Sequence, residues 1–532
     1  MNPRHSLTVL SAALLLTSGA ALAHDEGGQG GRVGRVKFAS SCSPEVQPLL
    51  ETGVAMLHSF WFTATEKAFR DVLARDPSCT IAHWGVAAIL MGNPLAGQGA
   101  LAKDAAAAQA AIDAGRQVPP KTQRERDYIE AVAAYYRDFA TRPERARQQS
   151  RSEAFQALAA RYPEDDEAQI FAALYIAGTQ SQSDQTFGAY RKAAAVLEPQ
   201  FVRHPDHPGV AHYLIHSYDA PPLAQQGVKA ARLYAGIAPA APHALHMPSH
   251  IFTRIGAWED SAATNRRASE AAKTSGEPDQ AYHASDYSVY AYLQMGRDAD
   301  AQREIQEALQ VKGYNAGVRT APYAIAAMPA RYALERGAWR EAMQLQPQPT
   351  RHLYPDAITH FARALGALRT GDTAAAQKEA AELERLHKGL QAAGDSYWAG
   401  EVEVQRLAVA GWMALAQGDA TNAVRLMRAA ADLEDGTEKH IVTPGRVLPA
   451  RELLGELLLE VKQPAAALRE FEASQVREPN RFRSLSGAAR AAEESGDRAK
   501  AALYYGKLVE LAKGADAPRP ELLKARAWFA QR

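Results

Sequence analysis

Short turns centred on glycine recur along this chain between apolar stretches long enough for helices. Examples are RIGAWEDSA, QMGRDADAQ, ERGAWREAM, RTGDTAAAQ, AQGDATNAV and ESGDRAKAA. The flanking stretches are rich in Ala, Leu, Glu and Arg and lack the dense Val, Ile and Thr alternation that is typical of strands. Glycine readily ends a helix, so each turn favours a hairpin of two helices. The chain is therefore predicted to be helical nearly throughout.

The spacing around these turns is regular. After Gly418, for example, small residues follow at Ala423 and Ala430. The pattern resembles the tetratricopeptide repeat (TPR), a helix-turn-helix unit of about 34 residues with small residues where its helices touch and a proline near its end. This resemblance covers most of residues 45–515 and is clearest after residue 243.

The resemblance implies an all-α, right-handed solenoid of helical hairpins with a concave groove that binds ligands. Two stretches, 92–125 and 434–450, depart from the repeat, and such insertions often lie on the binding side of a solenoid. The expected organisation is a signal peptide at 1–23, a flexible segment at 24–44, an irregular TPR-like array at 45–242, a regular TPR-like array at 243–515, and a capping helix or tail at 516–532.

The first residues, MNPRHSLTVLSAALLLTSGAALA, combine a basic start, a short apolar run and an A-L-A site before His24. These features predict a cleaved secretory signal; an uncleaved anchor is the alternative. No later stretch offers some 18 uninterrupted apolar residues, so we expect no membrane span after signal cleavage. The mature protein is expected to be soluble and periplasmic or secreted.

The chain contains two cysteines, Cys42 and Cys79. In an exported protein an isolated pair is expected to form a disulfide, which here would tie the N-terminal segment to the first helices. Two free buried thiols are the alternative, and metal ligation by this pair is the less favoured one.

Charge argues against a nucleic-acid partner. Lysine plus arginine equals aspartate plus glutamate at 60 each, and the two signs are interspersed. No basic surface for nucleic acid or anionic lipid is implied. A peptide, a protein segment or a small ligand is the expected partner.

The stretch APHALHMPSHIFTRIGAWED places three histidines at spacings of three and four, and on a helix His243, His246 and His250 share one face. Aligned on Gly256, they belong to the first helix of a hairpin, the helix whose face lines the groove in TPR arrays. The resemblance therefore implies groove-lining histidines. Pro248 either lies early in this helix or marks its start.

Neighbouring repeats add polar residues to the same face. Aligned on Gly296, the next unit puts His283, Asp286 and Tyr290 at matching offsets, and the preceding unit supplies His212 and His216. The groove set predicted in this way comprises His58, His212, His216, His243, His246, His250, Arg254, His283, Asp286 and Tyr290. Of these, Arg254, His283 and Tyr290 are expected to be solvent-accessible.

Three interpretations of the histidines remain open. Neutral imidazoles with a supporting carboxylate suit Zn²⁺ or Cu²⁺, and the predicted ligands are His243, His246, His250, His283 and Asp286; alternatively, Asp286 fixes the tautomer of a histidine ligand. The second interpretation is structural, because histidine fills helical arrays where a ring with hydrogen-bonding ends is needed. The third is metal-free catalysis, with His246 or His250 as base, Asp286 as its orienting group and Arg254 as an anion site. The catalytic residues, and whether the chain is an enzyme at all, stay unknown.

The leading functional hypothesis is an exported TPR scaffold that holds a peptide, protein segment or small ligand in its concave groove. The alternative is a metal-binding or metal-dependent protein with a histidine-rich site for zinc or copper. A peptide groove spreads its contacts over several repeats, whereas a metal site needs three or four donors that converge on one point.

Overall fold

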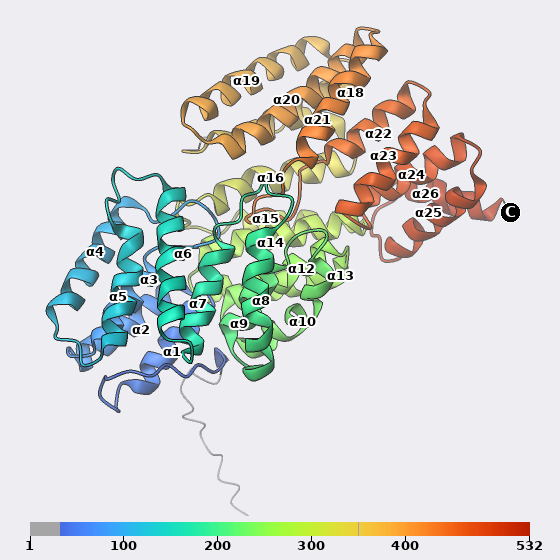
Figure 1. The fold of residues 1–532 in the computed structure, drawn as a ribbon. Coiled ribbons are helices and arrows are strands. Elements are labelled where there is room, and N and C mark those ends of the chain that lie inside the picture. The colour runs from blue at the N-terminus through green and yellow to red at the C-terminus, as the bar shows by residue number, and fades with distance from the viewer. Residues whose placement is uncertain (1–31, 349, 532) are drawn as a thin grey trace, which may run out of the picture.

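A computed structural model describes residues 32–348 and 350–531, and this part of the chain is helical without strands (Figure 1). The predicted signal peptide and the segment up to residue 31 lie outside the described residues. None of the described helices is both long enough and apolar enough to cross a membrane.

The first half of the chain folds into helices of 5 to 18 residues. Their bounds are α1 Gln47–His58, α2 Phe62–Arg75, α3 Thr80–Ile89, α4 Ala102–Gln117, α5 Gln123–Tyr136, α6 Glu144–Arg161, α7 Asp166–Ala177, α8 Gly188–Arg203, α9 Pro208–Ser217, the 3-10 turn η2 Ala224–Gly227, α10 Val228–Ile237, α11 Pro242–His246, α12 Pro248–Arg254 and α13 Trp258–Thr274.

The second half continues the array with longer hairpins. Their bounds are α14 Pro278–Gln294, α15 Asp298–Ala308, α16 Thr320–Glu335, α17 Trp339–Met343, α18 Leu353–Thr370, α19 Thr373–Ala392, α20 Ser396–Ala416, α21 Ala420–Asp435, α22 Ala450–Glu460, α23 Pro464–Arg477, α24 Phe482–Glu494, α25 Arg498–Leu511 and α26 Pro520–Ala530.

The Gly-Asp pairs make the hairpin turns that the sequence predicts. Gly371 ends α18 with a φ of 87°, a left-handed conformation that suits glycine. The next residue, Asp372, caps α19 by accepting a hydrogen bond from the backbone N–H of Ala375 at 2.9 Å. Asp419 caps α21 in the same way. One dipeptide thus ends one helix and starts the next.

Successive hairpins stack as in a solenoid, because α14, α16, α18, α20, α22 and α24 each contact the next helix in this inner series. Close approach depends on small residues. A Cβ built on Gly455 or Gly487 would lie 2.7 Å or 2.3 Å from the Phe471 ring, so both helices can approach α23 only with glycine there. The fold is an all-α, TPR-like helical-hairpin solenoid.

The solenoid also closes on itself at two places. Helix α1 packs against α9, and α14 packs against α24, although the members of each pair lie far apart in the sequence. In Figure 1, α14 lies in the middle of the molecule, between the N-terminal helices and the α22–α26 end. Inner helices that face solvent in an open groove therefore face other parts of the chain here.

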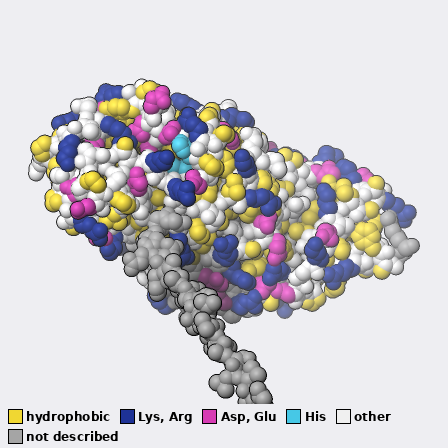
Figure 2. All heavy atoms as spheres, turned by 90° about the horizontal axis from the view of Figure 1, so that it is seen from below, with side chains coloured by type: hydrophobic (Ala, Val, Ile, Leu, Met, Phe, Trp, Pro, Cys, Tyr) yellow, Lys and Arg dark blue, Asp and Glu magenta, His cyan; other side chains and the backbone are white. Residues whose placement is uncertain are grey.

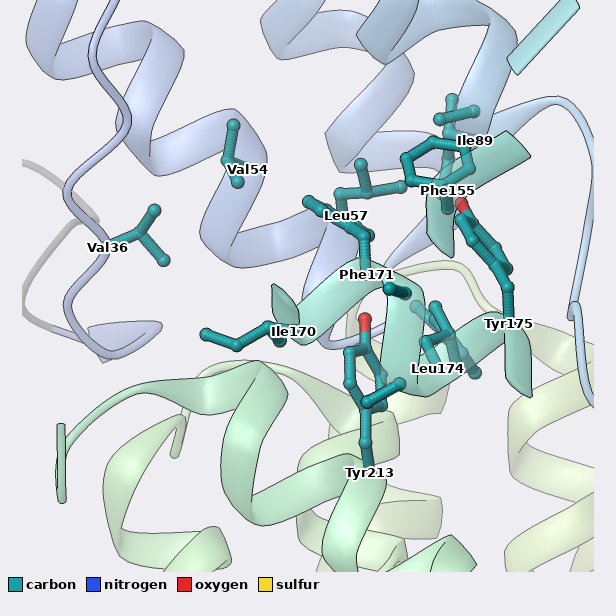
Figure 3. Packing of buried hydrophobic residues seen from close by; sticks show 14 of the residues in the cluster. Val36, Val54, Leu57, Ile89, Phe155, Ile170, Phe171, Leu174, Tyr175 and Tyr213 are labelled. Carbon is teal, nitrogen blue, oxygen red and sulfur yellow. The ribbon is translucent and has the colours of Figure 1, made fainter. Parts of the chain in front are cut away.

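The N-terminal end has a continuous aromatic and aliphatic core, in which Phe171, Tyr175 and Tyr213 lie close to Leu57 and Phe155 (Figure 3). Cys42 and Cys79 form the expected disulfide at its edge. The bond holds the N-terminal segment over α3, where Phe38 stacks on Trp84 with ring centroids 5.3 Å apart.

The predicted insertion at 434–450 becomes an ordered segment between α21 and α22. We call residues 436–449 the strap. It crosses the inner side of the array, where the Tyr287 hydroxyl donates to the Thr443 carbonyl at 2.9 Å and Arg331 donates to the carbonyls of Gly445 and Arg446 at 2.9 and 2.7 Å. The strap fills part of the space that an open solenoid leaves to solvent.

Candidate metal centre

Six histidines from four inner helices meet below the strap. They are His212 and His216 of α9, His243 and His246 of α11, His250 of α12, and His283 of α14. Each is at most 7% exposed. Their nitrogens fall into two sets of three, with one ligand atom per residue, and within each set these atoms lie within 4.8 Å of one another.

Set 1 is His212, His216 and His243, and set 2 is His246, His250 and His283. The two sets are neighbours, since the His216 and His250 rings have centroids 5.4 Å apart and those of His243 and His246 are 5.8 Å apart. Pro248 divides the predicted helix into α11 and α12, and the three histidines around it stay together.

Two lone pairs face each other in set 2. The Nδ1–H of His246 donates to Asn265 Oδ1 at 2.6 Å, and the Nδ1–H of His250 donates to Asp219 Oδ2 at 2.7 Å. The amide nitrogen of Asn265 donates to the Ser261 carbonyl, so its oxygen is the atom turned toward His246. Both imidazoles, when neutral, thus carry their lone pair on Nε2. These two Nε2 atoms are 3.0 Å apart.

Two nitrogen atoms whose lone pairs face each other at 3.0 Å repel each other unless a cation lies beside them. Nitrogen ligands about 2.0–2.1 Å from a metal, at angles of 90–109°, are about 2.8–3.4 Å apart. The His246–His250 pair matches that spacing. In set 1, the Nε2 atoms of His212 and His216 are also 3.0 Å apart, and the His212 Nδ1–H donates to the His58 carbonyl at 2.6 Å.

The remaining ligand atoms are buried without a hydrogen-bond partner in the described part of the chain. His243 donates from Nδ1 to Gln280 Oε1 at 3.1 Å, which leaves its Nε2 unpartnered. His283 donates to the backbone of Val442 in the strap, and its Nδ1 is unpartnered. Such orphaned nitrogens cost free energy unless a ligand satisfies them.

Burial keeps the six imidazoles neutral. It lowers the pKa of every member of the two sets, and it lowers the pKa of His243 to about 3. Neighbouring histidines act in the same direction on His216 and His246. Neutral imidazole is the form that binds a metal ion, so all six are available as ligands near pH 7.

A third cluster, His58, Glu167 and His207, shows the contrast. Both histidines donate from Nε2 to the carboxylate at 2.8 Å. Their Nδ1 atoms accept in turn, from the Tyr213 hydroxyl at 2.9 Å and from the Val210 N–H at 3.3 Å. Every ring nitrogen is satisfied by protein, so this cluster is a structural network. His58, predicted to line the groove, belongs to it and is fully buried.

Asp219 is the carboxylate that orients His250. Besides His250, it accepts from Arg254 at 2.8 Å and from Lys439 of the strap at 3.2 Å. Burial alone would raise its pKa, but Lys439 and Arg254 hold the pKa of Asp219 well below its usual value. Arg254 also pairs with Glu438 at 3.1 Å. It is therefore committed to protein carboxylates and is not an anion site.

Asp286 is not part of either set of ligands, contrary to the prediction. It lies on α14, 3.3 Å from Arg331, and burial raises the pKa of its carboxyl to about 6. The proposed metal-free arrangement, which needs Asp286 to orient a histidine base, is therefore wrong in this respect.

The expected exposure of Arg254, His283 and Tyr290 is also wrong: the three are 9%, 7% and 1% exposed. Tyr290 packs edge-on against Trp258, and its hydroxyl donates to Glu478 at 2.9 Å. The cause is the closure of the solenoid. The strap and the α23–α24 region cover the inner helices that the repeat pattern assigns to an open groove.

A cavity of about 340 Å³ remains beside the histidines. Its floor includes His216, His243, His250 and His283. The exposed residues Thr63 and Asn315 also line it, and we call this exposed part of the lining its mouth. The centre can therefore be reached by a small molecule from solvent.

The comparisons with known proteins concern the arrangement of helices. No protein-family model matches the chain, and no curated protein matches it. Human IFIT1 with m7Gppp-AAAA is similar in structure at 12% identity and a TM-score of 0.40, over 86% of this chain and 95% of that chain. The APC/C hetero-tetramer Cut9-Hcn1 (11% identity, TM-score 0.29, 90% and 97% covered) and yeast Tom70 (10%, 0.28, 91% and 89%) are further matches.

Proposed function

We propose that this chain is a metal-dependent protein that holds a pair of metal ions, copper or zinc, in its two histidine sets and presents them to a small molecule in the adjoining cavity. The observation that carries the proposal is the pair of Nε2 lone pairs of His246 and His250, which face each other at 3.0 Å. A metal ion resolves this contact and also satisfies the orphaned nitrogens around it.

The donor set favours open sites. Three nitrogens per ion leave a coordination position for an outside ligand, as in catalytic rather than structural metal sites. Imidazole without thiolate suits copper and zinc among the common metals. Such ions supply Lewis acidity, an activated water or, for copper, electron transfer.

The chain's own residues orient this donor set. Asn265, Asp219 and the His58 carbonyl hold three Nδ1 protons away from the centre, so that Nε2 points inward. Lys439 and Arg254 compensate the buried charge of Asp219. These contacts fix ring orientation before any ion binds, which lowers the cost of assembling the site.

A peptide-binding scaffold is the second candidate, and it has less support. Its groove would run along the inner helices, but the strap and α24 cover much of that surface. A cavity of about 340 Å³ is in the range of small-molecule pockets. Acidic and basic side chains are interspersed on the face that Figure 2 shows, and the numbers of the two are equal over the chain, so we propose no nucleic-acid partner. The disulfide supports the expected periplasmic or secreted location.

Metal content tests the proposal. The protein, incubated with Zn²⁺ or Cu²⁺ and freed of excess metal, is expected to retain two ions per chain by elemental analysis. His216→Asn, which removes one ligand of set 1, and His283→Asn, which removes one ligand of set 2, should each reduce retention to about one ion, because two nitrogens bind far more weakly than three. Both rings have an unpartnered Nδ1, so their loss removes few protein contacts.

His204→Asn is the matched control, since His204 lies near α9 but bonds to Asp166 at 2.7 Å, away from both sets. It should retain two ions. Retention of no metal by the unaltered chain, or equal retention by all four proteins, would contradict the proposal.

A further inference from the structure

Four carboxylates line the cavity that ends at the histidines: Glu66, Asp104, Glu277 and Asp279. Glu66 pairs with Arg70 at 2.7 Å, whereas the other three form no ion pair with a lysine or arginine in the described ranges. The one cationic side chain among the described residues of the cavity wall is Arg319, and it pairs with Asp395 at 2.9 Å. The wall therefore carries more negative charge than the protein itself compensates.

Two of these carboxylates are held at the mouth by neighbours that leave an oxygen free. Glu277 is 8% exposed and accepts from the hydroxyl of Thr63 through Oε1. Asp279 accepts from the backbone N–H of Asn315 through Oδ2 at 3.0 Å, and its buried Oδ1 has no partner. Burial raises the pKa of Glu277 and raises that of Asp279 to about 6. A cation beside them would offset the cost of burying this charge.

The rest of the wall between mouth and floor is largely apolar. It includes Phe62 of α2, Leu90 directly after α3, Leu101 directly before α4, and Ile441 and Val442 from the strap. Burying the apolar part of a small molecule against these side chains is favourable. A hydrated ion has no apolar surface to bury here, so these side chains would not stabilise its binding. Three histidines of the same cavity wall have a ring nitrogen without a partner: Nδ1 of His216, Nε2 of His243 and Nδ1 of His283.

We infer that the cavity binds a small organic cation, a primary amine with a compact apolar body, whose ammonium group lies between Glu277 and Asp279 while its other end points to the histidine floor. The ammonium group donates to the free oxygens of both carboxylates, and the apolar body contacts Phe62 and Ile441. This inference rests on the proposed function only for the group that the other end of the amine contacts at the histidines. The carboxylates act at the mouth whether or not the centre holds metal.

Three compounds with the same phenylethyl group and different charge test the inference: 2-phenylethylamine, 2-phenylethanol and 3-phenylpropionate. Binding is measured by calorimetry at pH 7.5, above the pKa of Asp279 of about 6, on metal-loaded and metal-free protein. The amine is expected to bind at least about tenfold more tightly than the alcohol, and the carboxylate should not bind. The preference should hold in both forms of the protein.

The variant Glu277→Gln/Asp279→Asn should abolish the preference for the amine. Glu164→Gln, which removes an exposed carboxylate remote from the cavity wall, should leave the preference unchanged. Equal binding of amine and alcohol by the unaltered protein would overturn the inference, as would a preference that survives the double substitution. Binding of Zn²⁺ with no binding of the amine would also overturn it.

Metal content of the same samples separates this inference from the proposed function. If the amine preference is present and no metal is retained, the metal centre is wrong and the amine site stands. If two ions are retained and the amine binds no better than the alcohol, the metal centre stands and the amine site is wrong.

Discussion

Replacing Arg481 by methionine is expected to lower the free energy of unfolding by about 3–5 kcal/mol, because it leaves buried carboxylates without their partner. Arg481 is fully buried at the start of α24 and donates to Glu335 at 2.6 Å and to Glu452 at 2.6 and 2.9 Å. It also donates to the Tyr290 hydroxyl of α14. One guanidinium thus joins α14, α16, α22 and α24 where the solenoid closes.

Urea unfolding followed by circular dichroism measures this effect. Arg490→Met is the matched control on the same helix, since Arg490 is 40% exposed and pairs with Glu494 within one turn of α24. Its loss should cost no more than about 0.5 kcal/mol. If the two variants unfold at the same urea concentration, α24 does not close the array in the way described.

Metal ions are expected to stabilise the native protein strongly, and the variant His246→Ala/His250→Ala is expected to lose the part of this stabilisation that set 2 supplies. At a free metal concentration one hundred times the dissociation constant, the gain in the free energy of unfolding is about 2.7 kcal/mol per site. The variant removes the two facing nitrogens of set 2, so the gain from that set should vanish. Thermal melts with and without Zn²⁺ or Cu²⁺ measure the difference within each protein.

The metal-free variant will itself be less stable, because both rings are buried and hydrogen-bonded to Asn265 and Asp219. Each lost hydrogen bond to a buried group costs about 1–3 kcal/mol. The metal centre is therefore tested by the change in melting temperature that metal causes within each protein, and not by the melting temperature of the metal-free protein. His204→Ala should keep the full shift. Identical shifts in all three proteins, or none in any, would remove the metal centre from consideration.

Local patterns in the sequence predict much of the fold. The Gly-Asp turns become hairpins because glycine ends one helix at φ 87° and aspartate caps the next, as at Gly371 and Asp372. The disulfide could be predicted from the pair of cysteines together with the expectation that the chain is exported. The clustering of His212, His216, His243, His246, His250 and His283 follows from helical spacing and repeat alignment, both of which act over short distances.

Contacts between distant segments could not be predicted in this way. The strap brings Lys439 to Asp219, 220 residues earlier, and no periodicity links the two. Repeat alignment also gave Asp286 the face of His283, although it turns toward Arg331 of the next inner helix. The sequence offers one hint of the closure, because residues 434–450 depart from the repeat pattern. That departure does not show which surface of the solenoid the segment covers.

Anomalous X-ray diffraction from crystals of the metal-loaded protein tests most directly whether the six histidines hold two metal ions. Data collected at the absorption edge of the bound zinc or copper should show two peaks, one about 2.0–2.1 Å from the nitrogens of His212, His216 and His243 and one at the same distance from those of His246, His250 and His283. Peaks only on the surface, a peak at His58, Glu167 and His207, or none at all would contradict the account.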